Sequence, residues 1–266
     1  MAGARPAPAP VVACIDGSGH SAWVCEYAAW LAGRRGPAGE VLHLDDRPPG
    51  PTPAPGSLSR LDGYIRDGGE QLMQEAAGWV LDSGADLGDL MVGLGPVVEV
   101  AGRLSEAAGA LVIGQRGRSS PFHSLRLGAN VLGIISRSAA PVCLAPARPR
   151  TVSRVLALYN AAFPDEALTR FVGVDPALDG LDCRLVAYGG AGASRPRGDA
   201  SPAAVVESCL KEQDFDLLVL PRSTLVGHPH RRELEGLITV LERPVMLPAQ
   251  GGLARTLFEA RSAARP

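Results

Sequence analysis

The apolar residues in the first half of the chain fall into short runs separated by longer stretches with helical spacing. The runs lie at residues 11–15, 41–44, 90–94, 110–113 and 141–144. They do not alternate with polar residues, which is typical of strands buried on both faces of a parallel sheet. The stretches between them, at 23–31, 58–81, 97–108 and 128–138, carry apolar residues three or four positions apart and predict helices. The pattern therefore predicts a doubly wound α/β domain.

The second half of the chain repeats this plan in a shorter form. Residues 155–159 resemble 12–16, residues 218–221 resemble 111–114, and residues 244–247 resemble 141–144. The match places Tyr159 at the position of Asp16. Only one more apolar run, at 184–188, lies before the second of these segments, where the first half has two. The repeat predicts two doubly wound domains in tandem, the second shortened by an outer strand, and leaves open which outer strand is lost.

The repeat divides the chain into a Pro-rich, flexible N-terminus, a first domain, a linker, a second domain and a tail. The expected boundaries are 1–10, 11–147, 148–153, 154–250 and 251–266. In each domain the final strand is the outermost one, and unpaired strand edges tend to pair. We therefore predict that 141–144 and 244–247 pair antiparallel in an internal pseudo-dimer, or that each pairs across a homodimer.

Composition and charge exclude several classes of protein. The 266 residues include 26 basic and 28 acidic side chains, and a net charge of −2 offers no general attraction for nucleic acid or an anionic membrane. No stretch approaches the ~20 consecutive apolar residues of a membrane span. The five cysteines are an odd number scattered singly, and no secretory signal precedes the first strand. We expect a cytoplasmic protein that binds neither nucleic acid nor membrane.

Two loops of the first half carry candidate chemistry, because ligands of open parallel sheets lie beyond the carboxyl ends of the strands. Asp16-Gly17-Ser18 follows the first strand. Gly114-Gln115-Arg116-Gly117 follows the fourth and leads to Gly128-Ala129-Asn130 at the start of a helix. Glycines let the backbone approach a phosphate, and the N–H groups of a helix start favour negative charge, so the loops predict a nucleotide site. The alternatives are a plain strand-ending turn and a tight crossover.

These segments resemble the universal stress protein family. The likeness rests on VVACIDGSGHS, VLHLDD, Gly95-Pro96, VIGQRG and GANVLGIISRSAAPVCLAP. It spans 11–146 and is weaker over 154–249. The resemblance implies adenine nucleotide alpha hydrolase-like domains that pair through their last strands and bind an adenine nucleotide, or relatives that bind none. The residues it places around the nucleotide are Asp16 at the ribose or adenine, Leu44 at the base, and Ile113, Gly114, Gly117 and Gly128 at the phosphates.

The candidate site departs from the ATP-binding members of the family at two points. The spacer between the second and third glycines has ten residues instead of nine, and Ala129 stands where a serine or threonine hydroxyl would bind phosphate. One hydrogen bond to a charged acceptor contributes about 1.5–3 kcal/mol, so its loss would weaken binding by about one to two orders of magnitude. Arg116, Arg118 and Ser119 offer compensating donors.

The second copy has lost most of these features. Tyr159 replaces the acid, and Pro221 replaces the first loop glycine and removes a backbone donor. His228 and His230 belong to a basic loop without acidic or thiol partners at metal-ligand spacing, which is typical of a solvated turn. We expect this half to be a structural partner of the first.

Two functions fit these observations. The first is a stress-associated regulatory protein that binds ATP or another adenine nucleotide, with Mg²⁺ accompanying the nucleotide. The second is a scaffold that binds no nucleotide and acts through protein partners. An adenylating enzyme is not supported, because the loop 16–21 differs from the Ser-Gly-Gly-x-Asp-Ser pyrophosphatase loop, and Ser18 lacks a Gly-x-Ser-x-Gly elbow. The sequence predicts no catalytic residues, no metal ligands and at most weak ATP hydrolysis.

Overall fold

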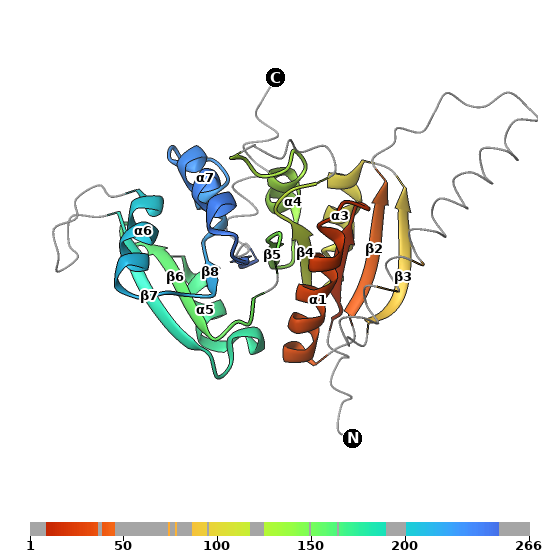
Figure 1. Cartoon of the computed structure of the whole chain (residues 1–266), viewed down its shortest axis with the longest axis horizontal. Helices are drawn as coiled ribbons and strands as arrows, with labels where there is room; N and C mark the ends of the chain where they lie inside the picture. The colour runs from red at the N-terminus through yellow and green to blue at the C-terminus, as the bar shows by residue number, and fades with distance from the viewer. Residues whose placement is uncertain are drawn as a thin grey trace, which may run out of the picture.

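The computed structural model of the chain is an open sheet with helices on both faces (Figure 1). The structure describes residues 9–36, 39–45, 74, 78, 87–94, 96–117, 125–148, 150–163, 165–189 and 201–249. The helix predicted at 58–81, apart from the helical positions 74 and 78, lies outside the described residues. The same holds for residues 1–8 of the flexible N-terminus predicted at 1–10 and for the tail at 251–266.

The first half forms five parallel strands with the predicted doubly wound arrangement. Its elements are β1 (Val11–Ile15), α1 (Ser21–Arg35), β2 (Gly39–Asp45), β3 (Leu87–Leu94), α3 (Val97–Leu104), β4 (Ala110–Gly114), α4 (Val131–Arg137) and β5 (Val142–Ala145). The strand order is β3-β2-β1-β4-β5, and every neighbouring pair is parallel. The order reverses between β1 and β4, so their carboxyl ends frame the position where ligands of such sheets bind.

The second half repeats this arrangement with four strands among the described residues. Its elements are β6 (Arg154–Asn160), α5 (Glu166–Val174), η1 (Pro176–Leu178), β7 (Asp182–Tyr188), α6 (Pro202–Glu212), β8 (Leu217–Val219), η2 (Arg222–Thr224), α7 (Arg231–Leu241) and β9 (Val245–Leu247). The order β9-β8-β6-β7 matches β5-β4-β1-β2. Among the described residues, the second half therefore has no counterpart of β3.

Local signals in the sequence explain where several helices begin and end. Helix α1 ends at Arg35 because Gly36 adopts a φ of +90° and its N–H donates to the Ala32 carbonyl. Helix α5 begins after Asp165, whose carboxylate accepts hydrogen bonds from two N–H groups of the first turn. Helix α4 begins at Val131, three residues later than predicted, because residues 128–130 form a turn.

The strand registers correct one part of the predicted repeat. In the first half, Val12 of β1 lies beside Leu111 of β4. In the second half, Leu156 of β6 lies beside the counterpart of Leu111 in β8. Leu156 thus corresponds to Val12, and Asn160 corresponds to Asp16. This is one position later than the sequence match predicted, because the run RVLALYN is apolar enough to match in either register.

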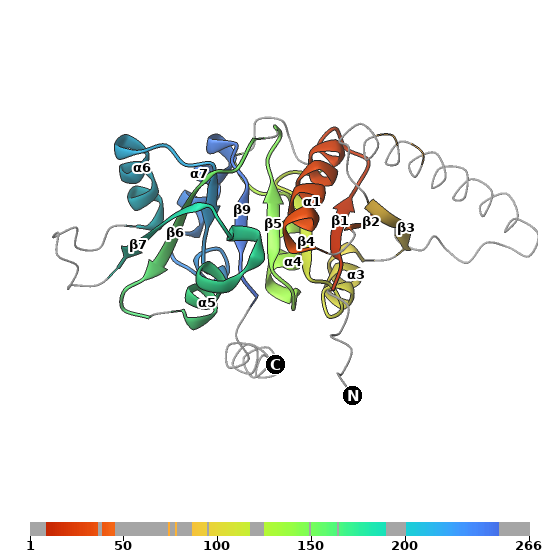
Figure 2. The same ribbon diagram turned by 90° about the horizontal axis from the view of Figure 1, so that it is seen from below.

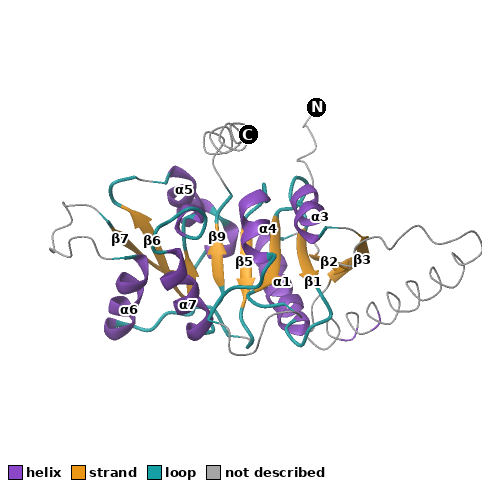
Figure 3. Ribbon diagram, turned by 90° about the horizontal axis from the view of Figure 1, so that it is seen from above, coloured by secondary structure: helices purple, strands orange, loops and turns teal. Residues whose placement is uncertain are grey.

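The two halves join into a single nine-stranded sheet through their last strands (Figure 2). Strands β5 and β9 pair antiparallel, with Cys143 beside Met246 at the centre. This confirms the predicted internal pairing of 141–144 with 244–247. Helices α1 and α5 pack on one face of the sheet and α3, α4, α6 and α7 on the other (Figure 3). Each of the two hydrophobic cores contains residues of both halves.

Two side chains at equivalent positions bridge the halves beside the β5–β9 pair. Gln115, just after β4, donates from Nε2 to the Arg243 carbonyl at 2.7 Å. Arg222, which occupies the same place after β8, donates to the carbonyls of Ile135, Ser138 and Ala140 in the first half. Arg222 is 3% exposed, and burial lowers the pKa of its guanidinium to about 10. The second-half bridge is therefore a buried charge that binds the carbonyls at the end of α4.

Candidate functional site

The end of β1 presents Asp16 in a tight turn. The Asp16 carboxylate accepts a hydrogen bond from the Ser18 N–H at 3.0 Å through Oδ1, and Gly17 adopts a φ of +70°. This turn leads directly into α1, whose first residue, Ser21, is 1% exposed. The Ser21 hydroxyl has no hydrogen-bond partner among the described residues. A buried hydroxyl without a partner is costly, and it marks a place where a ligand atom could bind.

The glycine loop after β4 lies against this turn. A Cβ atom on Gly117 would lie 2.8 Å from Oδ2 of Asp16, and one on Gly114 would lie 2.8 Å from the Arg116 carbonyl oxygen. Neither position has room for a side chain without movement of backbone or carboxylate. The structure thus brings Asp16 and the Gly114–Gly117 loop together at the switch point of the sheet, as the sequence analysis expects.

The third glycine of the pattern is engaged within the protein. The Gly128 N–H donates to the Gln115 carbonyl at 2.9 Å, which ties the start of α4 to the glycine loop. Ala129 is exposed and Asn130 is half-buried; the Asn130 side chain makes no capping hydrogen bond to α4. Residues 118–124 of the spacer lie outside the described part of the chain.

The remaining predicted site residues lie at strand ends. Ile113 is the penultimate residue of β4 and is buried in the hydrophobic core. Leu44 lies in β2 beside Gly93 of β3, and its side chain is outside the described part of the structure. Arg116 is half-buried within the glycine loop.

The same place in the second half is built from different side chains. Asn160 makes the same turn as Asp16, because its Oδ1 accepts a hydrogen bond from the Ala162 N–H at 2.9 Å. The register places Tyr188 at the position of Leu44. The Tyr188 ring is 5% exposed and lies edge-on to His228 at 6.1 Å between centroids. Burial raises the pKa of the Tyr188 hydroxyl to about 12, although a hydrogen bond with the Asn160 side chain acts in the opposite direction.

Comparison with known proteins relates the chain to universal stress proteins. No protein-family model matches the chain. The Universal stress protein Slr1230 of Synechocystis sp. (strain ATCC 27184 / PCC 6803 / Kazusa) is 24% identical over 245 residues, which cover 82% of this chain and 81% of that protein. The match extends over both halves. This likeness supports membership of the universal stress protein family.

Solved structures share the fold of this chain over nearly its whole length. A universal stress protein from Archaeoglobus fulgidus DSM 4304 superposes with a TM-score of 0.60 at 17% identity, over 92% of this chain and 98% of that chain. A functionally unknown protein, PA1789 from Pseudomonas aeruginosa PAO1, gives 0.60 at 14% identity, over 97% and 98%. At these identities the likeness concerns the fold alone.

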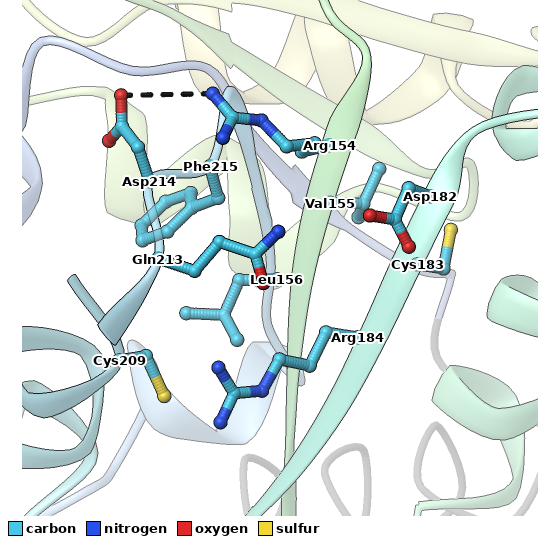
Figure 4. A pocket seen from close by; sticks show the side chains of 10 residues that line it. All are labelled: Arg154, Val155, Leu156, Asp182, Cys183, Arg184, Cys209, Gln213, Asp214 and Phe215. Atoms are coloured by element: carbon cyan, nitrogen blue, oxygen red, sulfur yellow. Dashed lines mark ion pairs between the residues drawn. The ribbon is translucent and has the colours of Figure 1, made fainter. Parts of the chain in front are cut away.

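The second half of the chain also has a pocket of about 310 Å³ that the sequence analysis did not predict (Figure 4). It lies at the amino ends of β6 and β7, at the opposite end of the strands from Asn160 and Tyr188. The lining residues are Arg154, Val155, Leu156, Asp182, Cys183, Arg184, Cys209, Gln213, Asp214 and Phe215. Arg184 pairs with Glu212 at 2.7 Å, and Asp214 pairs with Arg243 at 2.6 Å.

Within the described residues, no group of three or more His, Cys, Asp or Glu side chains is arranged to hold a metal ion. In the same part of the chain no helix has the length and apolar character needed to cross a membrane.

Proposed function

We propose that this protein is a universal stress protein-like regulatory protein that binds ATP or another adenine nucleotide in its first half. The observation that carries the proposal is the contact between Asp16 and Gly117, where a side chain at position 117 would overlap the carboxylate. A carboxylate at the end of β1 suits the hydroxyls of a ribose, and a glycine loop beside it suits close approach of phosphates. A cytoplasmic location belongs to the same proposal.

Each predicted residue would have a simple task in nucleotide binding. Asp16 would accept hydrogen bonds from the ribose or adenine, and Leu44 would contact the base. The backbone of Gly114 and Gly117 would approach the phosphates, and the Arg116 guanidinium would neutralise part of their charge. Mg²⁺, when present, would arrive with the phosphates, since the described residues supply no ligand cluster of their own.

Tyr188 supports the assignment of the nucleotide to one half. At the second strand end, this buried ring takes the position of Leu44, where a base would have to lie. Pro221 follows at the position of Gly114. The second half would therefore act as a structural partner and bind no nucleotide.

One observation favours a second candidate, a scaffold that binds protein partners and no nucleotide. The Gly128 N–H is already bonded to the Gln115 carbonyl, and Ala129 offers no hydroxyl. A phosphate at this loop would thus lack two donors that the ATP-binding pattern supplies, at a cost of about 1–3 kcal/mol for each missing hydrogen bond.

Calorimetric titration with ATP separates the two functions. We expect saturable binding by the wild-type protein and at least a tenfold loss of affinity in Asp16→Ala. Asn160→Ala, which changes the matching turn of the second half, is the control and should bind ATP as the wild type does. Absence of heat at millimolar ATP would favour the scaffold, and equal losses in the two variants would contradict a site in the first half.

A further inference from the structure

Gln115 holds the candidate nucleotide loop to three parts of the molecule at once. It lies between Gly114 and Arg116 and is 5% exposed. Its N–H donates to the Ala145 carbonyl of β5 at 2.9 Å, and its own carbonyl accepts the Gly128 N–H at 2.9 Å. Its side-chain amide donates to the Arg243 carbonyl in the second half at 2.7 Å. Any displacement of the Arg243 carbonyl would thus act directly on the backbone between the two loop glycines.

The Arg243 side chain is held in turn by the wall of the second-half cavity. Its guanidinium pairs with Asp214 at 2.6 Å and donates to the Phe215 carbonyl. The same group lies over the Phe215 ring, 4.5 Å from its centre. Asp214 and Phe215 both line the cavity, where Asp214 also faces Arg154 at 4.0 Å (Figure 4). Direct contacts therefore run without a gap from the cavity wall to the glycine loop.

The equivalent bridge on the other side does not reach a candidate nucleotide site. Arg222 contacts the first half at the end of α4 and at Ala140, and it donates to Pro248 within its own half. It follows Pro221, which replaces the first loop glycine. Of the two related bridges, the Gln115 bridge alone has its side chain on a glycine loop.

We propose that Gln115 and Arg243 are positioning residues through which the second half sets the nucleotide affinity of the first. This inference rests on the proposed function. The second half is then a regulator of the site, because a change at Asp214 or Phe215 is passed to the Gly114–Gly117 loop by the Arg243 carbonyl. Coupling between sites is reciprocal, so bound nucleotide must also stabilise the Gln115–Arg243 contact.

Three variants test the coupling by ATP titration. Gln115→Met removes the donor at similar volume, and Arg243→Met removes the anchored guanidinium but keeps the carbonyl that Gln115 contacts. Arg184→Met is the matched control, because it removes an arginine–carboxylate pair from the same cavity without touching Arg243. We expect ATP affinity to fall about tenfold in Gln115→Met, about fivefold in Arg243→Met and less than about twofold in Arg184→Met. The double variant of Gln115 and Arg243 should bind as weakly as Gln115→Met alone.

Hydrogen exchange of the Gly128 amide gives a second readout that needs no nucleotide. This amide donates to the Gln115 carbonyl, so Arg243→Met should speed its exchange and Arg184→Met should not. The Gly36 amide at the end of α1 should be unchanged in both and controls for global destabilisation. If wild-type protein binds no ATP, the proposed function fails and Gly128 exchange decides the coupling. Additive losses of affinity, or equal Gly128 exchange in the two arginine variants, would overturn it.

Discussion

The two strand-end sites, one after β1 and one after β6, share the same backbone turn and differ in the residues that contact it. Asp16 and Asn160 make the same turn, with the same side-chain oxygen accepting an N–H two residues later. In the first half the turn meets a glycine, whereas in the second a buried tyrosine hydrogen-bonds to the turn residue. The comparison teaches that the two halves keep the same turn while the residues beside it change; under the proposed function, such a change alone removes the nucleotide site from the second half.

The same contrast holds at the other end of the strands. The Gly109 N–H donates to the Pro10 carbonyl, and the Asp216 N–H donates to the equivalent Arg154 carbonyl. A Cβ atom on Gly109 would lie 2.4 Å from the Ala9 carbonyl oxygen. In the second half, the Asp216 carboxylate instead accepts hydrogen bonds from the neighbouring backbone. At this end of the strands the two halves thus make the same backbone hydrogen bond and differ in the side chains around it.

The largest expected effect concerns the asymmetry of the two bridges. Arg222→Met should lower the free energy of unfolding by about 3 kcal/mol or more, because it leaves four buried carbonyls without their charged donor. Gln115→Met, which removes one neutral donor, should cost about 1 kcal/mol. Urea denaturation of both variants measures the difference. Equal losses would show that the two bridges contribute alike.

The second effect concerns the contact that distinguishes the first site. Gly117→Val places a branched side chain against the Asp16 carboxylate, where even a Cβ atom would approach to 2.8 Å. We expect ATP affinity to fall at least tenfold and the free energy of unfolding to fall by about 1–3 kcal/mol. Titration and thermal unfolding measure the two quantities. Gly33→Ala, at an exposed helical position with open space around it, is the control for a glycine change as such. Unchanged ATP affinity in Gly117→Val would show that the glycine loop is not part of the nucleotide site.

Asp216 provides a third test, specific to the second half. Burial raises the pKa of its carboxyl, but hydrogen bonds from Ser153 and from the Arg154 N–H outweigh burial and lower the pKa overall. A lowered pKa contributes stability above the unfolded value near 3.9, and this contribution is lost as the pH falls through that region. Asp216→Asn should cost about 1 kcal/mol at pH 7. In urea titrations, the gap from wild type should close below about pH 4; a constant gap would contradict the assignment.

The smallest effect lies at His228, in the loop between η2 and α7. Burial, followed by the nearby His230, lowers the pKa of the His228 ring. Its neutral Nδ1 accepts the His230 N–H at 3.2 Å. The stability this gives is present above the unfolded pKa near 6.5 and is lost as the pH falls below it. Thermal unfolding between pH 5 and 7.5 should show that the free energy of unfolding falls by less than about 1 kcal/mol as the pH is lowered, and His228→Asn should reduce this pH dependence. An unchanged pH dependence in the variant would show that groups other than His228 cause it.

The sequence predicts those parts of the fold that depend on burial alone. Continuous apolar runs identify the strands, and the position of 141–144 and 244–247 at the ends of the two copies predicts their antiparallel pairing. The meeting of Asp16 with Gly117 also follows, because the carboxyl ends of neighbouring parallel strands share one edge of the sheet.

Other features depend on partners that are distant in sequence and leave no local signal. Arg222 looks like a loop arginine after a proline, and its burial arises from carbonyls some 80 to 90 residues earlier in the chain. The match of Tyr159 to Asp16 was wrong by one residue because an apolar strand does not fix its own register. The cavity walls come from strand ends and a helix end that only the fold brings together.

NMR mapping of the chemical shifts of backbone amides on addition of ATP tests most directly whether one half binds the nucleotide and the other does not. The amide chemical shifts of Gly114 and Gly117 should change and reach saturation as ATP is added. The amide signals of Gly189, just after β7, and of Gly227, in the loop between η2 and α7, should not change. Shifts of equal size at Gly189, or none at Gly117 at millimolar ATP, would contradict a nucleotide site confined to the first half.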